Sequence, residues 1–545
     1  MPVCAGPTSI GYVALYIRFT CEKSKRKNDC VRLIQITDLH LSDRTDTPAA
    51  AALQWAIAEA NRLVPDLVAV TGDITTYGTA TAAGNFLAAT AALEVPWVFT
   101  PGNAELRDPG AMPILGQCMR SKSVYIGDVQ FLLPDTSTGR LSEQERNWLA
   151  AESQSGVRGR VILTHYPIDV LDQDSRRWIE AWLQEWPVEM YLAGHRHFDR
   201  SRRMGDSQEI TTRGLDPEKA FGGPAGISLL ERDAKGQWAL EQIPWPHEQS
   251  LLPADVDHSP VGWSIHGDPL ETVRETRDAG LSVLELRPRE PRYDLPATVR
   301  DLQALRDDRP IYLSWHLPNL VWDEETGRVA GSEEVARQID DGRACATDSF
   351  TVHVPKINAA AMFDTAGEPS AAWDSFLSCY EGLFRDVVAA GIRVSIENIH
   401  NQPGTPADRP NRGFATEIGE YLAWIDSVEG RIGHEAGRIG AHFDVGHARN
   451  NGDLGNLQPI GDWYARVGKR ITGYHIHQVR PHEETGKLTN HRDILSVYDR
   501  TVSYAGFLHA WSQRQINREP LFIEVRIAEE RRRTVKLFEE LFAAA

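Results

Sequence analysis

Cysteine is scarce in this sequence, and its few copies are not spaced as metal ligands or disulfide partners are. The 545 residues include six cysteines, and no two of them form a Cys-x-x-Cys pair. Neither a disulfide framework nor a thiolate zinc site is therefore expected. A reducing compartment suits such a chain best, so we expect a cytoplasmic protein.

A long apolar run and an excess of basic residues are also missing. Nothing in the chain approaches the roughly 18 consecutive apolar residues that a membrane-spanning helix needs. Lys and Arg together number 58 against 76 Asp and Glu, which gives a net charge of −18. Affinity for nucleic acid depends largely on Lys and Arg at the phosphates. We therefore expect no membrane and no nucleic acid partner, whereas a homo-oligomer stays open.

The length exceeds that of one ordinary domain, and the composition, with 41% apolar and 25% charged residues, is that of a globular protein. Residues 1–30 place an apolar patch before a basic run, the reverse of a signal peptide, and are expected to be a disordered extension. A proline-rich stretch, residues 246–260, is the expected linker. It divides the chain into two domains, at residues 31–245 and 261–545.

In the first domain, apolar strands alternate with Ala-rich helical stretches, and each strand ends in a polar cluster. This pattern predicts an α/β layered domain with its site at the C-terminal ends of the strands. The polar clusters are, in order, Asp38-x-His40, Gly72-Asp73, Gly102-Asn103, His165 and Gly194-His195-x-His197. The glycines allow sharp turns at the strand ends. One such motif alone would be an ordinary turn, but five in series predict a shared site.

The chemistry of these side chains indicates a pair of metal ions. Carboxylate and amide oxygens mixed with imidazole nitrogens suit Mn, Fe or Zn. Two such cations about 3.5–4 Å apart can clamp a phosphate and activate water. We therefore expect two divalent cations in the first domain.

The motif series resembles the calcineurin-like metallophosphoesterases, over about residues 31–245. The resemblance implies a first cation on Asp38, His40 and His197, a second on Asn103, His165 and His195, and a bridge at Asp73. It also implies that Asp73 and Asn103 are catalytic, in hydrolysis of a phosphodiester or phosphomonoester.

One position departs from that family. After Gly-Asn the family usually has a His that stabilises or protonates the leaving oxygen, whereas this chain has Ala104 followed by Glu105. Ala104 replaces no ligand, so metal binding should survive. General acid help is typically worth about 10²–10⁴-fold. The domain is therefore expected to prefer good leaving groups, to use Glu105 at the substrate instead, or to be slow.

From residue 261 a second alternation of strands and helices begins. Eight strand candidates follow one another: Gly262–His266, Ser282–Leu286, Ile311–His316, Phe350–His353, Arg393–Glu397, Gly440–Asp444, Ile471–His477 and Leu521–Val525. Eight strand–helix units in about 250 residues are typical of a (β/α)₈ TIM barrel. The fold class is thus α/β throughout, a layered domain followed by a barrel.

The strand ends of the barrel are rich in His and carboxylate side chains. They are His316, His353, Glu397, Asp444, His447, His475, His477 and Glu524, with His491 in the loop after the seventh strand. Side chains from the C-terminal ends of different strands converge in this fold. Polar residues lining a water-filled mouth would explain one such His, but six strand ends alike favour bound metal.

These motifs resemble the xylose-isomerase-like TIM barrels, which include sugar isomerases, epimerases and the AP-endonuclease family 2 enzymes. The epimerase pattern implies one cation on Glu397, Asp444, His475 and Glu524, with Glu397 and Glu524 as catalytic proton carriers. The endonuclease pattern implies further ligands at His316, His353, His447 and His491. Its loop motif is Asp-x-His, and here Asn490 precedes His491, so a third site would lack one carboxylate. One to three cations are therefore expected in the barrel, with His477 binding substrate.

Together these expectations define a bifunctional metal-dependent phosphoesterase that acts on a small phosphorylated sugar or nucleotide, with a second metal-dependent step in the barrel. The alternative is a sugar or sugar-phosphate isomerase or epimerase whose first domain binds a regulatory phosphate. The missing His at position 104 motivates that alternative. A third reading is an interaction scaffold with vestigial sites, and the retention of all seven first-centre ligand types argues against it.

Overall fold

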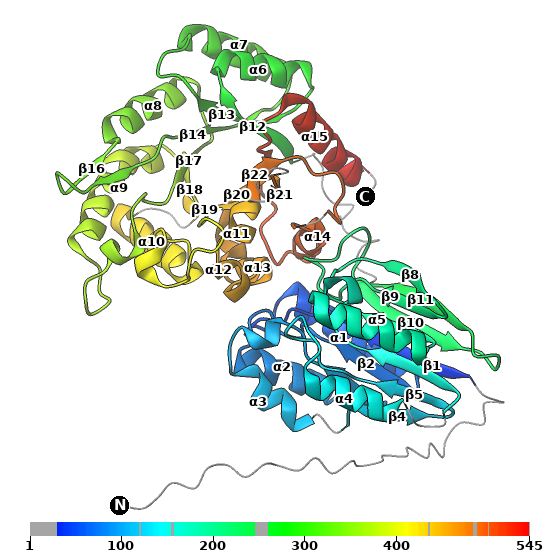
Figure 1. Ribbon diagram of the computed structural model, residues 1–545. Coiled ribbons are helices and arrows are strands. Elements are labelled where there is room, and N and C mark those ends of the chain that lie inside the picture. The colour runs from blue at the N-terminus through cyan, green and yellow to red at the C-terminus, as the bar shows by residue number, and fades with distance from the viewer. Residues whose placement is uncertain are drawn as a thin grey trace, which may run out of the picture. The chain divides into compact units, whose positions relative to one another are not determined.

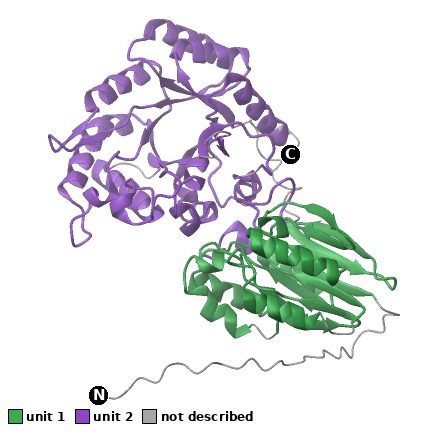
Figure 2. Cartoon of the chain, in the orientation of Figure 1, with its two compact units in different colours: residues 1–43, 52–215, 226–244 green, residues 44–51, 216–225, 245–545 purple. Residues whose placement is uncertain are grey.

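The computed structural model describes residues 30–118, 121–153, 157–245, 260–433, 437–482, 488–499 and 501–543. The expected extension and linker thus lie outside the described residues, except for their last positions, 30 and 260. The chain forms two compact units, shown in different colours in Figure 2. The first unit groups residues up to 43 with 52–215 and 226–244, and the second groups 44–51 and 216–225 with residues from 245 onward.

The first unit contains two β-sheets. One has the strand order β11-β10-β1-β2-β3, and the other β4-β5-β6-β7-β9-β8. The strands are β1 (Val31–Ile36), β2 (Leu67–Thr71), β3 (Trp97–Thr100), β4 (Ser123–Ile126), β5 (Val129–Leu132), β6 (Gly159–Leu163), β7 (Met190–Ala193), β8 (Arg200–Met204), β9 (Ser207–Thr211), β10 (Gly226–Arg232) and β11 (Trp238–Pro244). The helices in this part of the chain are α1 (Pro48–Leu63), α2 (Ala80–Thr90), α3 (Ala111–Leu115), α4 (Glu143–Glu152) and α5 (Gln173–Glu185).

The central strands of this unit are buried on both faces, which explains their uninterrupted apolar sequences. Val161 and Leu163 of β6 pack in one cluster with Leu33 and Leu67 of the other sheet. Ile162, between them in sequence, packs instead with Leu149 of α4 and other residues under α4 and α5. The two sheets therefore lie face to face, with helices on the outer side of the second sheet.

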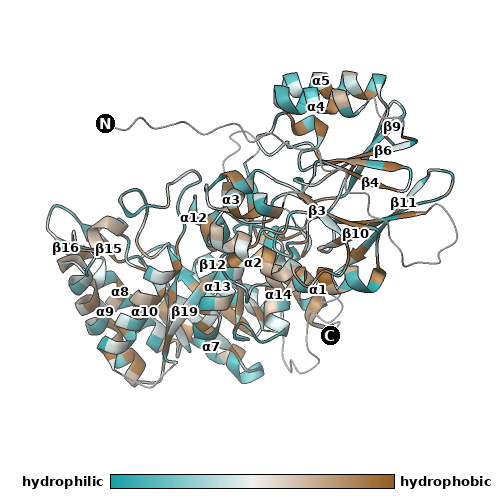
Figure 3. Cartoon of the chain, turned by 90° about the horizontal axis from the view of Figure 1, so that it is seen from below, coloured by the Kyte–Doolittle hydropathy of each residue, from teal (hydrophilic) through white to brown (hydrophobic). Residues whose placement is uncertain are grey.

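The helices are amphipathic, because one face packs on a sheet and the other meets solvent. In α5, Ile179, Trp182 and Leu183 are buried, whereas Arg176 and Arg177 are exposed. Figure 3 shows both hydrophilic and hydrophobic segments along this helix. In the described part of the chain, no helix combines the length and the apolar character needed to cross a membrane.

The second unit is a closed barrel of eight strands, each parallel to its neighbours (Figure 1). Its strands are β12 (Val261–Gly267), β13 (Val283–Pro288), β14 (Tyr312–His316), β17 (Ser349–His353), β18 (Arg393–Glu397), β19 (Ile439–Asp444), β20 (Ile471–Ile476) and β23 (Leu521–Ile523). Every strand predicted from the sequence is present, and the ends differ by at most two residues. The predicted fold class is confirmed.

Helices and two small hairpins complete this unit. The helices are α6 (Pro269–Asp278), α7 (Leu295–Asp308), α8 (Ser332–Ala344), α9 (Ala371–Ala389), α10 (Ile418–Ile432), α11 (Val445–Arg449), α12 (Leu454–Leu457), α13 (Ile460–Val467), α14 (Tyr504–Ser512) and α15 (Ala528–Ala543). The hairpins pair β15 (Val321–Asp323) with β16 (Arg328–Ala330), and β21 (Gln478–Pro481) with β22 (Leu488–Arg492). The second hairpin carries His491, one of the predicted ligands.

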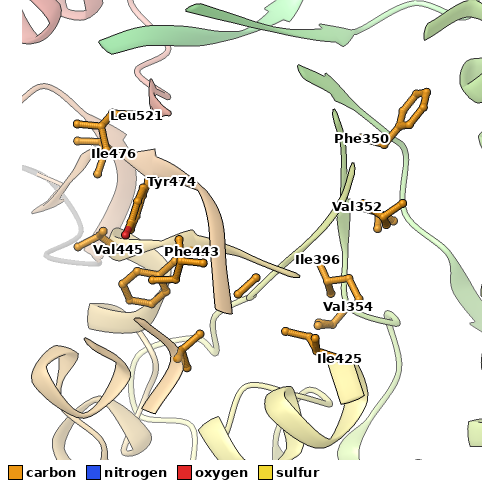
Figure 4. Packing of buried hydrophobic residues seen from close by; sticks show 14 of the residues in the cluster. Phe350, Val352, Val354, Ile396, Ile425, Phe443, Val445, Tyr474, Ile476 and Leu521 are labelled. Atoms are coloured by element: carbon orange, nitrogen blue, oxygen red, sulfur yellow. The ribbon is translucent and has the colours of Figure 1, made fainter. Parts of the chain in front are cut away.

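The barrel strands send apolar side chains outward and polar ones inward. Phe350 and Val352 of β17 belong to the large apolar cluster between strands and helices, part of which Figure 4 shows. Thr351, between them, is fully buried and donates a hydrogen bond to the carboxylate of Glu285 on β13. Because alternate residues of a strand face opposite sides, the barrel interior is polar. This interior lies directly beneath the mouth, where the predicted ligands gather.

Candidate metal centres

The predicted ligands of the first unit follow strands β1, β2, β3, β6 and β7, and several have an unusual backbone conformation. Positive φ angles occur at Asp38 (51°), His40 (48°), Asp73 (47°), His195 (70°) and His197 (58°). A residue other than glycine rarely adopts this conformation, and such strain concentrates at functional sites. The surrounding fold therefore holds these five side chains in imposed positions.

Two of the neighbouring glycines are required by close approach rather than by a turn. A Cβ atom at Gly194 would lie 1.9 Å from Thr37 Oγ1, and one at Gly102 would lie 2.3 Å from the backbone nitrogen of Asp73. A sharp turn was expected at each of Gly72, Gly102 and Gly194. Only Gly72, with φ of 84°, needs the backbone freedom of glycine. At the two close contacts the loop after β7 lies against the loop after β1, and the loop after β3 lies against the loop after β2.

One group of side chains gathers around His40 and His197. Their Nε2 atoms are 3.2 Å apart. His197 Nε2 lies 3.3 Å from Asp38 Oδ1, and His40 Nε2 lies 3.8 Å from Asp73 Oδ2. All four side chains offer an atom toward one point, as ligands of a single cation would.

A second group gathers around His165. Its Nε2 atom lies 3.4 Å from Asp73 Oδ1, 3.3 Å from Asn103 Oδ1 and 3.2 Å from His195 Nδ1. Asp73 thus turns one oxygen to each group. The structure brings all seven residues predicted for this centre together, in the two sets that the family resemblance implies.

The hydrogen bonds around these side chains leave a ring nitrogen of His165 available to a cation. His165 Nδ1 donates to the carbonyl oxygen of Thr71 at 2.9 Å, which leaves the lone pair of Nε2 directed at the group. Two imidazole lone pairs at 3.2 Å repel unless a proton or a cation lies between them. Without a cation, a proton must lie between the two rings. Burial opposes protonation of His165, but the charge of Asp73 raises the pKa of His165 to about 9. The donor set therefore fits two borderline divalent cations.

Glu105, expected at the substrate, is fully buried. Its Oε1 accepts from the backbone N–H and the hydroxyl of Thr75 (2.8 and 3.0 Å), and its Oε2 accepts from the N–H of Gly102 (2.7 Å). Burial, together with the charge of Asp73, raises the pKa of Glu105 to about 7. These contacts favour a role in holding together the loops that follow β2 and β3, rather than a role in binding substrate.

Tyr166 was not anticipated from the sequence. Its hydroxyl donates to Asn103 Oδ1 at 3.2 Å, and its ring stacks on His195 with centroids 4.1 Å apart. The side chain is partly exposed, unlike its buried neighbour His165. A hydroxyl donor therefore lies at the edge of the first centre, where Ala104 supplies none.

In the barrel, Glu397 occupies the centre of the predicted ligands. Its Oε2 lies 2.9 Å from His316 Nε2 and 3.2 Å from His353 Nε2. Its Oε1 lies 3.0 Å from His475 Nδ1 and 3.6 Å from His447 Nδ1. Each oxygen faces a different imidazole pair, so the carboxylate is placed to serve two cations.

Glu524 completes the group of side chains around Glu397 Oε1. Its Oε2 lies 3.2 Å from His475 Nδ1 and 3.4 Å from His491 Nδ1. Within the part of the chain that the structure describes, two atoms of this group are buried without a hydrogen-bond partner, Glu524 Oε2 and His491 Nδ1. His491 also has a positive φ of 61°. A buried carboxylate oxygen without a partner is costly, and a cation would satisfy it.

His477, expected to bind substrate, is fully buried and belongs to a third group. Its Nε2 lies 3.1 Å from Asp444 Oδ1, and His447 Nδ1 lies 3.2 Å from Asp444 Oδ2. A Cβ atom at Gly446 would lie 2.0 Å from the His477 ring, so the glycine makes room for it. This geometry favours a ligand or positioning role over contact with substrate.

The polar interior beneath the mouth centres on Glu285, which sequence reasoning missed. Its oxygens accept hydrogen bonds from Ser264 (2.8 Å), Ser314 (2.9 Å) and Thr351 (2.7 Å), and Oε1 lies 2.7 Å from His475 Nε2. His475 therefore turns Nδ1 toward Glu397 and Glu524. Carboxylates that orient metal-binding imidazoles in this way raise metal affinity.

Glu285→Gln is accordingly expected to weaken cation binding in the barrel by about 10–100-fold. A chelator competition titration with Mn²⁺ or Zn²⁺ measures this change in the full chain. Ser264→Ala, which removes one hydroxyl from Glu285 and leaves His475 its partner, is the control and should stay within about threefold of wild type. Equal affinity in Glu285→Gln and wild type would show that the carboxylate does not orient His475 for a metal.

Two parts of the chain match known protein families. Residues 31–199 match the calcineurin-like phosphoesterase family, and residues 273–533 match the xylose isomerase-like TIM barrel family. The chain therefore joins a metallophosphoesterase domain to a barrel of the xylose isomerase-like type.

Among solved structures, a dimetal phosphatase from Danio rerio is 15% identical with a TM-score of 0.32, covering 39% of this chain and 95% of that chain. A D-allulose 3-epimerase from Methylomonas sp., in complex with D-allulose, is 18% identical with a TM-score of 0.37, covering 52% of this chain and 96% of that chain. No curated protein matches the chain.

Proposed function

We propose that the first unit hydrolyses a phosphodiester or phosphomonoester of a small molecule at a dinuclear metal centre. The observation that carries the proposal is Asp73, whose two oxygens face the two imidazole groups separately. Asp38, His40 and His197 would hold one cation, and Asn103, His165 and His195 the other. When bound, two such cations stabilise charge on a phosphoryl group and make water more acidic.

The side chains around the centre set its geometry before substrate arrives. The backbone N–H of His195 donates to Asp38 Oδ2 at 2.9 Å, and the N–H of Ala104 donates to Asp73 Oδ1 at 2.8 Å. Both carboxylates are thereby held in one rotamer. Preorganised groups of this kind need no rearrangement during the reaction, which is the main source of electrostatic catalysis.

Tyr166 is proposed to donate the proton that the leaving oxygen needs. Tyr166→Phe should lower kcat/KM for an alkyl or nucleoside phosphodiester by about 10–100-fold, because such leaving groups require protonation. Hydrolysis of bis(p-nitrophenyl) phosphate should change by less than about threefold, because p-nitrophenolate leaves without a proton. Tyr125→Phe, on β4, is the matched control. An equal loss with both substrates would point to a structural role for Tyr166.

For the barrel we propose a metal-dependent second step on a small sugar-like molecule, by hydrolysis or by isomerisation. Glu397, Asp444, His475 and Glu524 would hold one cation, and His316 and His353 would hold another with Glu397. The bridging position of Glu397 supports more than one cation. A third cation would be held by His447, His477 and His491 together with Asp444 and Glu524.

The alternative function, an isomerase or epimerase with a regulatory first unit, differs in one measurable respect. It predicts that the full chain, loaded with Mn²⁺ or Zn²⁺, binds phosphate at the first centre but does not hydrolyse phosphoesters. A panel of phosphodiesters and phosphomonoesters, assayed with a metal count on the same sample, tests this. Turnover that is lost with chelator and restored by added cation supports hydrolysis. A fully loaded first centre without turnover would overturn it.

A further inference from the structure

Three adjoining cavities open at the C-terminal ends of the barrel strands. Their volumes are about 610, 420 and 550 Å³, and Arg287 lines all three. Glu524 and His491 line the first and third, and His353 lines the second and third. The space where a substrate would meet the predicted ligands is therefore shared by these cavities.

Besides Arg531, which forms an ion pair with Glu275, four cationic side chains line this space. Arg287 lies within β13 and Arg289 just after it, Lys356 follows β17, and Arg526 follows β23. Each lines at least one of the cavities. They come from three separate strands, so the barrel closure, and not a local basic run in the sequence, brings them together.

The acidic groups nearby leave much of this positive charge without a counterpart. Arg287 forms an ion pair with Glu524, and Arg289 lies 3.9 Å from the exposed Glu290. Lys356 and Arg526 are exposed and make no ion pair with any described residue. A chain with a net charge of −18 thus presents a cationic rim at one mouth.

The other acidic residue on the rim is already engaged. Glu334 lines the cavity of about 420 Å³, and its carboxylate pairs with Arg337 of the same helix at 2.5 Å. It therefore offers little compensation to Arg289 or Lys356. Burial opposes the charge of Arg287, but the carboxylates among the predicted ligands compensate this charge and raise the pKa of Arg287. The positive charge left on the rim therefore lies mainly on Arg289, Lys356 and Arg526.

We propose that this rim, formed by Arg287, Arg289, Lys356 and Arg526, binds a phosphate ester on the barrel's substrate. The proposal rests on the barrel acting on a sugar-like molecule, and it specifies a phosphorylated one. A neutral sugar offers four cations only uncharged hydrogen-bond acceptors, whereas a phosphate supplies negative charge and accepts several charge-assisted hydrogen bonds at once. Arg287 also contacts Glu524, so it links the anion site to the predicted metal ligands.

The test uses the full chain loaded with Mn²⁺ and carrying Asp73→Asn, which weakens phosphate binding at the first centre, so that the contribution of the rim is given by the difference between rim variants in this background. Inorganic phosphate and acetate are titrated calorimetrically, and D-fructose 6-phosphate is compared with D-fructose. The double variant Lys356→Gln with Arg526→Gln should weaken phosphate and fructose 6-phosphate binding by about tenfold or more. Arg300→Gln, an exposed arginine of α7 that lines none of the three cavities, should leave both unchanged.

The outcomes separate the two proposals. Phosphate binding that is absent, or that is equally strong in the double variant, would overturn the anion site. Acetate bound as tightly as phosphate would replace the phosphate ester with a carboxylate. A metal count on the same samples that finds the barrel without cations would instead contradict the proposed metal-dependent step.

Discussion

Asp73→Asn is expected to lower kcat/KM for phosphoester hydrolysis by about 10²–10³-fold, the scale on which loss of one charge-stabilising group acts. Asn supplies a single carbonyl oxygen, whereas Asp73 turns Oδ2 to His40 and Oδ1 to His165. One of the two groups therefore loses its bridging oxygen, and both lose negative charge. A phosphoester assay with elemental analysis of the same sample measures activity and occupancy together.

The barrel provides an internal reference for this variant. Cations bound there should be retained, so the metal count should fall by one or two per chain rather than to zero. Asp66→Asn is the matched control, because the Asp66 carboxylate accepts the N–H of Arg32 at 2.8 Å and lies outside the centre. Undiminished turnover in Asp73→Asn would show that the phosphoesterase activity does not depend on a shared carboxylate.

The central strands of both units were predictable because they are buried on both faces and end in polar residues. The edge strands β4 and β8 were not. β4 and β8 lie at the two ends of one sheet, and β8 reads Arg-Ser-Arg-Arg-Met with no fully buried residue. A strand paired on one side only, with charged side chains toward solvent, lacks the apolar signal that identifies a core strand. The sequence therefore predicted the layered fold of the first domain but not how many strands each sheet contains.

The gathering of the predicted ligands was predictable for a related reason, since side chains at the C-terminal ends of parallel strands meet at one edge. Their supporting residues were not. Glu285 alternates with Leu284 and Leu286 in β13, and only this period of two hinted that it faces inward. Its partner His475 lies on β20, and no local pattern connects two strands so far apart in the chain.

Burial explains why two substrate-binding predictions lack support. Glu105 and His477 stand next to metal-binding motifs in the sequence, and both are fully enclosed in the structure. Adjacency along the chain says nothing of which way a side chain points after a strand ends. Tyr166 shows the converse, because it follows His165 directly and reaches the site only through the turn that places its hydroxyl on Asn103.

Glu397→Gln is expected to remove at least one cation from the barrel. The set formed by His316 and His353 has Glu397 as its carboxylate, with Oε2 at 2.9 and 3.2 Å from the two imidazoles. Gln keeps the size of the side chain but not its charge, so a divalent cation there would face neutral donors alone. The other set keeps Asp444 and Glu524 and should be weakened less.

A second variant makes this prediction decide the number of cations. His353→Ala removes a ligand from the first set and leaves His475, Asp444 and Glu524 intact. With two or more cations in the barrel, both variants lower the metal count, and cation-dependent stabilisation against heat falls with it because bound metal stabilises the folded state. With a single epimerase-like cation, His353→Ala leaves the count unchanged and Glu397→Gln alone lowers it. Phosphoester hydrolysis by the first unit should stay within about twofold of wild type in both variants, since neither substituted residue is a ligand of the first centre. A count unaffected by either substitution would contradict the assignment of Glu397 as a metal-bridging carboxylate.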